Sequence, residues 1–422
     1  VQSLTFFAPG GAEKFGAPYF LPRLEASLDG TGWRKIADLA LTPVPTTINF
    51  ARVTARKFRI VLAVNPKGGL SGFSPAAGID LRPVMAMLAP KRELPIAQLS
   101  FSNEARVHQF EAKAGFATVL DYAELAASDA PGSGITPVSV IDLTKHLKVD
   151  GTLDWTPPKG QWRVIRLGWS LTGKTNHPAP LEATGLEVDK LDGAAVRDYL
   201  NRYLGMYRDV VGNDLIGKRG IQALLTDSTE VGAFNWTPRM VEQFKRLRGY
   251  DPTPWMPVLT GVIIGTPAQS DAFLYDYRRT LADLHASEHY GTVAAFAREH
   301  SLKVYGEALE DRRPSLGDDM AMRRYADFPM AALWTWQRGE RPRPTLLGDM
   351  KGASSVAHLY GQNIAAAESM TSAFQYWAHS PADLRRVIDL EFAHGINLPI
   401  IHSSVHQPID DKQPGLSDRK SV

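Results

Sequence analysis

Carboxylates and imidazoles follow four segments of this 422-residue sequence that have the length and apolar character of buried strands. The clusters are Asp227–Glu230, Glu307–Asp311, Glu368–Met370 and His402–His406. Asp and Ser also cap helices, so any one cluster could be structural. However, a carboxylate that projects into the mouth of a barrel is costly to desolvate unless it binds or reacts with something. Recurrence at one topological position therefore indicates a site.

Carboxylates that come from different strands suit the hydrolysis of a glycosidic bond. One must be protonated to donate to the leaving oxygen, and the other must be ionised to activate water or attack carbon. Further carboxylates are hard oxygen ligands for Ca²⁺, whose shell a vicinal diol could complete. Because the chain has no cysteine, oxygen or imidazole must hold any metal. Nearby tryptophans could form flat platforms for sugar faces or could simply pack: Trp236, Trp334, Trp336 and Trp377.

Strand-like and helix-like segments alternate from about residue 161 onwards. The strand-like segments are 162–169, 220–225, 302–305, 364–367 and 396–401. The helix-like segments are 189–211, 237–249, 271–299 and 380–395. Repeated β–α units predict a parallel sheet, and their number favours a (β/α)8-type barrel over an open sheet. We therefore predict an α/β fold with a catalytic barrel over 161–422. Fewer than eight strands can be identified, which leaves open a barrel that is incomplete at its C-terminus.

The first part of the chain has the pattern of β structure. Short apolar segments at 24–28 and 57–62, with a hairpin-type turn at Asp29–Gly32, predict a β-sandwich over residues 1–90. That domain could be purely structural or a carbohydrate-binding-like module. A β-rich connecting domain is expected over 91–160, because Pro157–Gly160 marks a boundary.

Composition excludes several classes of protein. The 47 Lys+Arg against 45 Asp+Glu give a net charge of +2, which excludes a nucleic-acid-binding protein that works by bulk electrostatics. No apolar run approaches the roughly 18 residues of a membrane span. The chain begins at Val1 without an initiator Met, so we expect a trimmed chain or a piece of a longer one. The termini do not indicate a compartment.

Several motifs occur together and in order. Asp227–Glu230, followed by Asn235–Pro238 and Arg248–Pro252, resembles the α-L-rhamnosidases of glycoside hydrolase family 106. The same resemblance extends to Gly185–Lys190, Phe244, Tyr305–Glu307, Ala367–Ser369, Ser380–Pro381, Gly395–Asn397 and His402–Pro408. These matches span roughly residues 155–416, whereas the first 90 or so residues match nothing in detail.

The resemblance implies a multidomain bacterial enzyme with a (β/α)8 catalytic domain, for which an extracytoplasmic (periplasmic) location is favoured. It would remove terminal α-L-rhamnose from glycosides or oligosaccharides with inversion, and it would use Ca²⁺. By position, Glu230 would be the general acid and Glu368 the general base. Glu307 and Glu310 would be metal ligands, and their division of roles with Asp311 stays open.

The resemblance also implies residues that bind the substrate. His402 and His406 would touch the sugar or orient an acid, and Asp227 would bind substrate or metal. Apart from the resemblance, Trp236 and Trp377 are predicted to bind substrate as sugar platforms because they follow acidic clusters in the sequence. Because the family continues beyond the point that corresponds to residue 422, the barrel is expected to be truncated here.

Other interpretations remain. A retaining glycosidase could use Asp227 and Glu230 as its pair, or the chain could be a non-catalytic carbohydrate-binding fragment. A divalent-metal hydrolase for other substrates is the weakest alternative, because the sequence has no dense His-Glu-x-x-His motif. His285 and His289 lie four residues apart on one helix, but without partner ligands they are expected to pack rather than to bind metal.

Overall fold

The computed structural model describes residues 1–12, 18–66, 93–119, 121–125, 134–176, 179–309, 314–336, 339–372 and 378–402. These residues divide into two compact units. Unit 1 contains the described residues of 1–69, 90–172 and 233–280, and unit 2 contains those of 173–232 and 281–402. Among the described residues, no helix is long and apolar enough to cross a membrane.

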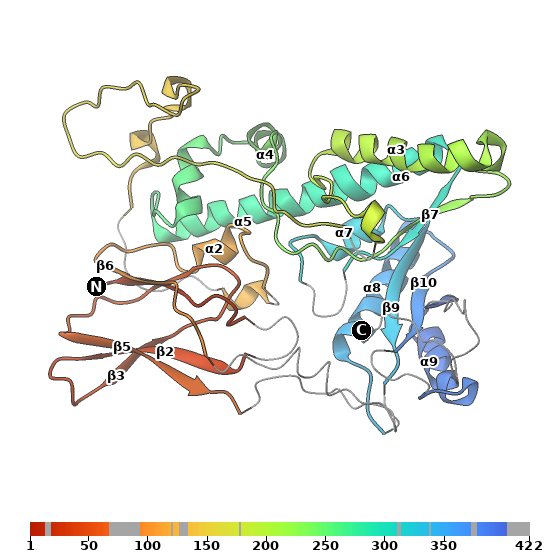
Figure 1. Cartoon of the computed structure of the whole chain (residues 1–422), viewed down its shortest axis with the longest axis horizontal. Helices are drawn as coiled ribbons and strands as arrows, with labels where there is room; N and C mark the ends of the chain where they lie inside the picture. Colours follow the sequence, from red (N-terminus) through yellow and green to blue (C-terminus); the bar gives the residue numbers. More distant parts are fainter. Residues whose placement is uncertain are drawn as a thin grey trace. The chain divides into compact units, whose positions relative to one another are not determined.

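Unit 1 contains two three-stranded antiparallel sheets, drawn in red and orange in Figure 1. One has the order β4-β1-β6 and the other β3-β2-β5. The strands are β1 (Ser3–Phe7), β2 (Phe20–Ser27), β3 (Arg34–Asp38), β4 (Thr46–Asn49), β5 (Lys57–Val64) and β6 (Gln98–Ser102). Leu4 and Phe6 of β1 share one buried cluster with Leu24 of β2 and Ile48 of β4, so the two sheets have a common core.

The hairpin predicted at Asp29–Gly32 is present between β2 and β3, which pair antiparallel. The Asp29 carboxylate accepts the N–H groups of Thr31 at 2.7 Å and Gly32 at 3.0 Å, and this Asx-type turn lowers its pKa. Gly30 has φ 92°, a left-handed conformation that glycine adopts without strain. Whether the unit binds a carbohydrate stays a prediction.

The helices of unit 1 pack through aromatic side chains. They are α2 (Phe110–Lys113), α4 (Met240–Arg248), η6 (Thr253–Thr260) and α5 (Pro267–Leu284), whose residues 281–284 belong to unit 2; short 3-10 turns occur at η1 (Tyr122–Glu124), η2 (Pro137–Ser139) and η3 (Thr144–His146). The ring of Phe273 in α5 lies 5.7 Å from that of Phe244 in α4 and 6.1 Å from that of Trp255 in η6.

The strand predicted at 162–169 is wrong, because the structure has no regular element there. Trp169 is 63% exposed and Val164 is 59% exposed. The apolar residues that suggested a strand are therefore not covered by any described part of the chain. A strand needs a neighbour for its backbone hydrogen bonds, and none of the described strands pairs with this segment.

Unit 2 is built on a five-stranded parallel sheet of order β11-β10-β9-β8-β7. Figure 1 labels β7, β9 and β10 of this sheet. The strands are β7 (Ala223–Thr226), β8 (Lys303–Gly306), β9 (Phe328–Trp334), β10 (Ala366–Thr371) and β11 (Leu398–Ile401). Each strand pairs with the next one in the chain, which is the order of a singly wound barrel and not of a doubly wound sheet. The fold is thus mixed α/β with a parallel half-barrel sheet, and the described residues do not form a full eight-stranded barrel.

Helices connect and cover these strands. They are α3 (Gly193–Val211), the π-helical η7 (His285–Gly291), α6 (Thr292–Glu299), α7 (Asp319–Arg323), α8 (Pro344–Tyr360) and α9 (Pro381–Ala393), with 3-10 turns at η4 (Leu181–Ala183) and η5 (Asn213–Leu215). Val196 and Leu200 of α3 pack with Phe296 of α6 in one buried cluster. Ala331 and Ala367 lie in a second cluster with helix α8, so small side chains on β9 and β10 face this helix.

Most predicted elements of unit 2 are present within a few residues of their expected positions. Strands β7, β8, β10 and β11 correspond to the segments predicted at 220–225, 302–305, 364–367 and 396–401. The predicted helix at 380–395 is α9, which a capping box between Ser380 and Asp383 begins. Strand β9 and helix α8 were not predicted.

Candidate active site

The first acidic loop begins where β7 ends. The carbonyl of Thr226 accepts the N–H of Glu307 at 2.9 Å, so the residues that follow β7 and β8 lie side by side. In the loop, the Ser228 N–H donates to Asp227 Oδ1 at 2.8 Å, and the Ser228 hydroxyl donates to Glu230 Oε1 at 3.1 Å. Asp227 is exposed and Glu230 is half-buried.

Glu307, the first residue after β8, is 3% exposed. Burial raises its pKa well above the ordinary value for a glutamate, and the nearby charges of Glu368, Asp227 and Asp349 raise it further. Only Arg323 acts in the opposite direction among the named neighbours. A buried carboxyl surrounded by other carboxylates will therefore hold a proton unless a cation replaces it.

Glu368 lies within β10, and a bulge next to it shapes its surroundings. The pairing of β10 with β9 shifts register between Ser369 and Thr371, and Met370 has φ 68°. In a regular strand, residues three apart face opposite sides, but the extra residue brings Thr371 round to Glu368. The Thr371 hydroxyl accordingly donates to Glu368 Oε1 at 2.7 Å. A left-handed non-glycine residue of this kind typically costs about 1–3 kcal/mol and is found mainly at functional sites.

Three carboxylates converge, two of them directly after β7 and β8 and the third within β10. Asp227, Glu307 and Glu368 each offer one oxygen, and these oxygens all lie within 4.8 Å of one another. Oxygen ligands bound to one Ca²⁺ at about 2.3–2.6 Å lie at most about 5 Å apart, so the spacing fits a single hard cation. The all-oxygen donor set and the mutual repulsion of the carboxylates also fit such an ion. No other potential metal-binding group of three or more His, Asp or Glu residues is present in the part of the chain that the structure describes.

A buried arginine lies behind this cluster. The guanidinium of Arg323 donates to Asp319 at 2.9 Å and also to Asp349 and the Met330 carbonyl. Asp349 in turn accepts the N–H of Ala332 at 2.7 Å, so the network fixes the backbone of β9. Burial raises the pKa of Asp349 to about 6, although Arg323 opposes that shift. Sequence reasoning missed this network, for which the i, i+4 spacing of Asp319 and Arg323 was the available signal.

The structure brings some of the predicted site residues together and does not describe others. Asp227, Glu307 and Glu368 come together, and His402 Nε2 lies 3.9 Å from Glu368 Oε1. Glu230 lies in the same loop as Asp227, beyond Ser228. Three predicted residues lie outside the described part of the chain: Glu310, Trp377 and His406. The catalytic and ligand roles of all of them stay predictions.

The tryptophans fit packing at least as well as sugar binding. Trp236 is half-buried in unit 1, and its Nε1 has no hydrogen-bond partner among the described residues. Trp334 and Trp336 pack against the buried cluster of unit 2. The guanidinium of Arg343 lies 5.9 Å from the Trp334 ring, and that of Arg386 lies 4.9 Å from the Trp336 ring.

His285 and His289 lie in the core of unit 2 on the π-helical segment. Their rings are 5.7 Å apart, and the ring of Tyr290 lies 5.4 Å from that of His285. Burial, assisted by the charge of Lys190, lowers the pKa of His285 to about 3 and also lowers that of His289. These neutral rings fit the predicted packing role.

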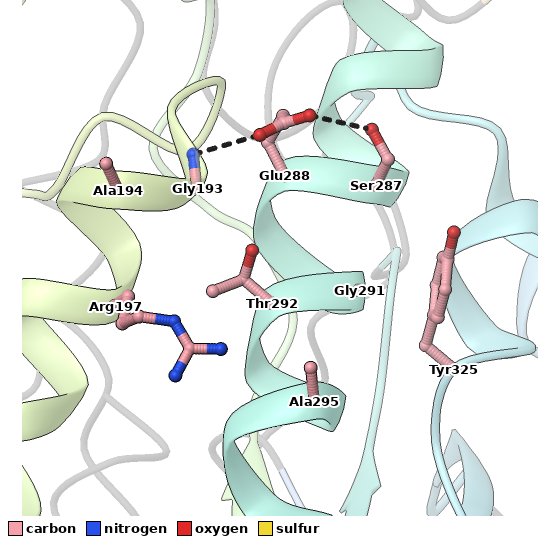
Figure 2. A pocket seen from close by; sticks show the side chains of 9 residues that line it. All are labelled: Gly193, Ala194, Arg197, Ser287, Glu288, Gly291, Thr292, Ala295 and Tyr325. Carbon is pink, nitrogen blue, oxygen red and sulfur yellow. Dashed lines mark hydrogen bonds between the residues drawn. The ribbon is translucent and has the colours of Figure 1, made fainter.

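A separate surface pocket of about 540 Å³ lies between the start of α3 and the η7–α6 helix (Figure 2). Glu288 accepts the Gly193 N–H at 3.2 Å across it, and Arg197 forms two hydrogen bonds with Glu299 at 2.7 and 2.9 Å. None of the three clustered carboxylates lines this pocket. Its main charged groups are already paired within the protein, so it offers less to a ligand than the carboxylate cluster does.

A family match and a solved structure both point to the rhamnosidases, whereas a further relative has another name. Residues 34–420 match the family described as alpha-L-rhamnosidase, glycoside hydrolase family 106. The solved structure of a rhamnosidase from Novosphingobium sp. PP1Y is 57% identical with a TM-score of 0.86, and the match covers 98% of this chain and 37% of that one. A Formosa agariphila protein named "Putative beta-glucuronidase" is 35% identical over 339 residues, which are 79% of this chain and 27% of that protein. The chain therefore spans only about a third of the length of these relatives.

Proposed function

Because the chain belongs to the alpha-L-rhamnosidase family of glycoside hydrolases, we propose that it carries the catalytic carboxylates of an enzyme that removes terminal α-L-rhamnose from rhamnose-containing glycosides or oligosaccharides. The observation that carries this proposal is the convergence of Asp227, Glu307 and Glu368, whose carboxylate oxygens lie within 4.8 Å of one another; the first two directly follow β7 and β8, and Glu368 lies within β10 of the same parallel sheet. In barrel enzymes the C-terminal end of the sheet is where substrates bind.

In the proposed mechanism, Glu230 and Glu368 divide the proton transfers. Glu230 donates its proton to the glycosidic oxygen as the bond from that oxygen to the anomeric carbon breaks. Glu368 accepts a proton from the water that attacks the opposite face of the sugar, which inverts the anomeric carbon. Such a pair is separated by about 6.5–9.5 Å, whereas a retaining pair is separated by about 5–5.5 Å. A retaining enzyme that uses Asp227 and Glu230 is the alternative within the class.

The carboxylate cluster would hold the Ca²⁺ ion that we propose as cofactor. Asp227 and Glu307 are the proposed ligands, and Glu310 is a further candidate outside the described residues. When bound, the ion would neutralise the cluster and offer coordination to vicinal sugar hydroxyls. Glu368 belongs to the same cluster, so it is a candidate both for a cation ligand and for the general base. The Glu368→Gln variant separates them, because the amide oxygen can still bind a cation but cannot act as a base at neutral pH.

Without a bound cation, the charge of the site favours a neutral sugar. A β-D-glucuronide carries a carboxylate, which three clustered carboxylates would repel unless a cation screened them. Rhamnose has no charged group. The name of the Formosa relative nevertheless makes a glucuronide the natural competitor in a test of substrate class.

The test compares aryl α-L-rhamnoside with aryl β-D-glucuronide, each with added Ca²⁺ and with excess chelator. We expect the rhamnoside to be hydrolysed and proton NMR to show the β-anomer of the sugar as the first product. Release of the α-anomer first would show that the enzyme retains the anomeric configuration and does not invert it. Hydrolysis of the glucuronide alone would contradict the proposed substrate. Binding of rhamnosides without turnover by the protein would support the non-catalytic carbohydrate-binding alternative.

A further inference from the structure

Tyr290 forms hydrogen bonds with both acidic loops, the one that follows β7 and the one that follows β8. Its hydroxyl lies 3.1 Å from Thr229 Oγ1 and donates to the Ala308 carbonyl at 3.4 Å. The Thr229 N–H donates to the same Ala308 carbonyl at 3.3 Å. Since the tyrosine hydroxyl donates to Ala308, the Thr229 hydroxyl is the donor in the third contact. The three residues thus form a closed cycle of hydrogen bonds.

The two ends of this cycle lie directly beside the carboxylates. Thr229 is between Asp227 and Glu230 in the loop after β7, and Ala308 follows Glu307 in the loop after β8. Strands β7 and β8 are held in register only as far as Thr226 and Gly306. Beyond that point, the Glu307 N–H bond to Thr226 and the Tyr290 cycle link the two loops.

The cycle is largely buried. Tyr290 is 6% exposed, Thr229 is 8% exposed and Ala308 is fully buried. Tyr290 and Ala308 pack with Ala286 and Met322 in one buried cluster. A hydroxyl lost from such a place cannot be replaced by bulk water, so its partners lose a hydrogen bond outright. Burial raises the pKa of Tyr290 to about 12, and the hydroxyl therefore remains a proton donor at ordinary pH.

The local backbone shows why Tyr290 can reach these loops. It lies in η7 (His285–Gly291), a π-helical segment between α5 and α6. Each turn of a π-helix contains more residues than an α-turn, so the side chains after it are rotated relative to a continuous α-helix. Helix α6 runs back along β8, and this places the π-segment at the level of the strand ends that carry Asp227 and Glu307. Such segments are rare and occur frequently at functional sites.

We propose that Tyr290 is a positioning residue for the reaction: through Thr229 it orients the loop of Asp227 and Glu230, and through Ala308 it holds that loop against Glu307. This inference rests on the proposed function of these carboxylates. It adds a residue that touches neither substrate nor cation but sets the relative geometry of acid and ligand loops.

The test uses Tyr290→Phe, which removes only the hydroxyl. We expect kcat to fall about 10-fold with KM within about twofold, because misplaced groups act mainly on the transition state. The loss should be larger for an alkyl rhamnoside, which needs the acid, than for an aryl rhamnoside with a good leaving group. Thr229→Val should cause a similar loss, and the double variant should be no worse than either single one.

The matched control is Tyr203→Phe. The Tyr203 hydroxyl also contacts another hydroxyl, that of Tyr207 at 3.2 Å, but on the surface of α3. This variant should keep wild-type kcat. A Tyr290→Phe enzyme with kcat within twofold of the wild type, or with additive losses in the double variant, would overturn the proposal.

A readout that does not need turnover distinguishes this proposal from the proposed function. Amide hydrogen exchange in the intact protein should become faster at residues 227–230 and 307–309 in Tyr290→Phe and stay unchanged in Tyr203→Phe. Faster exchange in a protein that hydrolyses no rhamnoside would leave the positioning role standing while the proposed substrate fails. Unchanged exchange at both loops would overturn the positioning role, whatever the activity.

Discussion

His402 approaches Glu368 from the neighbouring strand, with Nε2 3.9 Å from Oε1. His402 directly follows β11 and Glu368 lies within β10, and the His402 N–H donates to the Ser369 carbonyl at 2.9 Å. The Thr371 hydroxyl bonds the same Oε1 from the other side of the bulge. Groups from two places in the chain therefore orient the carboxylate that we propose as general base.

Replacing that base should nearly abolish turnover. Glu368→Gln keeps the size of the side chain but cannot accept a proton from water, so kcat should fall by roughly 10²–10⁴. His402→Ala should lower kcat only about 10-fold, because it acts on the orientation of Glu368. The matched control is His394→Ala at the end of α9, whose imidazole contacts the Leu390 carbonyl. Steady-state kinetics with one rhamnoside checks all three, and a Glu368→Gln enzyme with more than a tenth of wild-type kcat would contradict the role.

The role of Glu230 as general acid can be tested by comparing substrates with different leaving groups. Glu230→Gln cannot protonate the glycosidic oxygen, so hydrolysis of an alkyl rhamnoside should fall by about 10²–10⁴ while a nitrophenyl rhamnoside loses much less. Glu299→Gln on the surface of α6 removes only the ion pair with Arg197 and serves as control. Equal losses for both substrates in Glu230→Gln would show that another group donates the proton.

Cation binding should depend on pH through Glu307. Because its pKa is raised, Ca²⁺ must displace a proton from this carboxyl at mildly acidic pH, and affinity should increase as the pH rises. Saturation at about 100 times Kd should stabilise the fold by about 2.7 kcal/mol. Calorimetric titration at pH 5 and pH 8, with melting curves in Ca²⁺ and in chelator, measures both effects.

The Glu307→Gln variant is the control for the dependence of Ca²⁺ affinity on the protonation of Glu307. It should bind Ca²⁺ more weakly and lose most of the pH dependence, because the amide releases no proton. Full activity of the wild-type protein in excess chelator, without detectable bound metal, would remove the cation from the mechanism.

The sequence was informative where apolar strands end in acids. Asp227, Glu307 and Glu368 were identified because each follows or ends such a strand, and the structure brings them together. Strand β9 has an equally apolar sequence, but Thr335 and Trp336 follow it instead of an acid, so the same reasoning overlooked it. Local pattern thus located the carboxylates that follow strands better than it located the strands themselves.

Features that depend on long-range packing were not predictable from local pattern. The bulge at Met370, the π-helical turn at Tyr290 and the contact of Arg323 with Asp349 each require partners far away in the sequence. The opposite error occurred at 162–169, where an apolar segment had the composition of a strand but no described neighbour to pair with.

A buried acid behind the site should make stability depend on pH. Glu391 of α9 is fully buried, and burial raises its pKa to about 7 from the ordinary 4.5. The nearby Ser369 hydroxyl donates to the Ala367 carbonyl at 3.1 Å, so it does little to lower the pKa of Glu391. Neither Glu391 oxygen has a hydrogen-bond partner of normal geometry among the described residues. Between pH 4.5 and 7 the folded state keeps this proton while the unfolded state has lost it. Stability should therefore fall as the pH rises through this range, by a total on the order of 3 kcal/mol.

Glu391→Gln isolates this contribution, because the amide is similar in size and does not ionise. The variant should be more stable than the wild type at pH 8 and nearly equal to it at pH 4.5, where Glu391 is protonated in the fold. The matched control is Asp389→Asn on the exposed face of the same helix, in an ion pair with Arg385, where solvent screening leaves little effect. Urea unfolding at several pH values measures the difference. If the stability of Glu391→Gln followed the wild-type curve at every pH, Glu391 would contribute nothing to the pH dependence. The carboxyl would then not be held protonated in the fold.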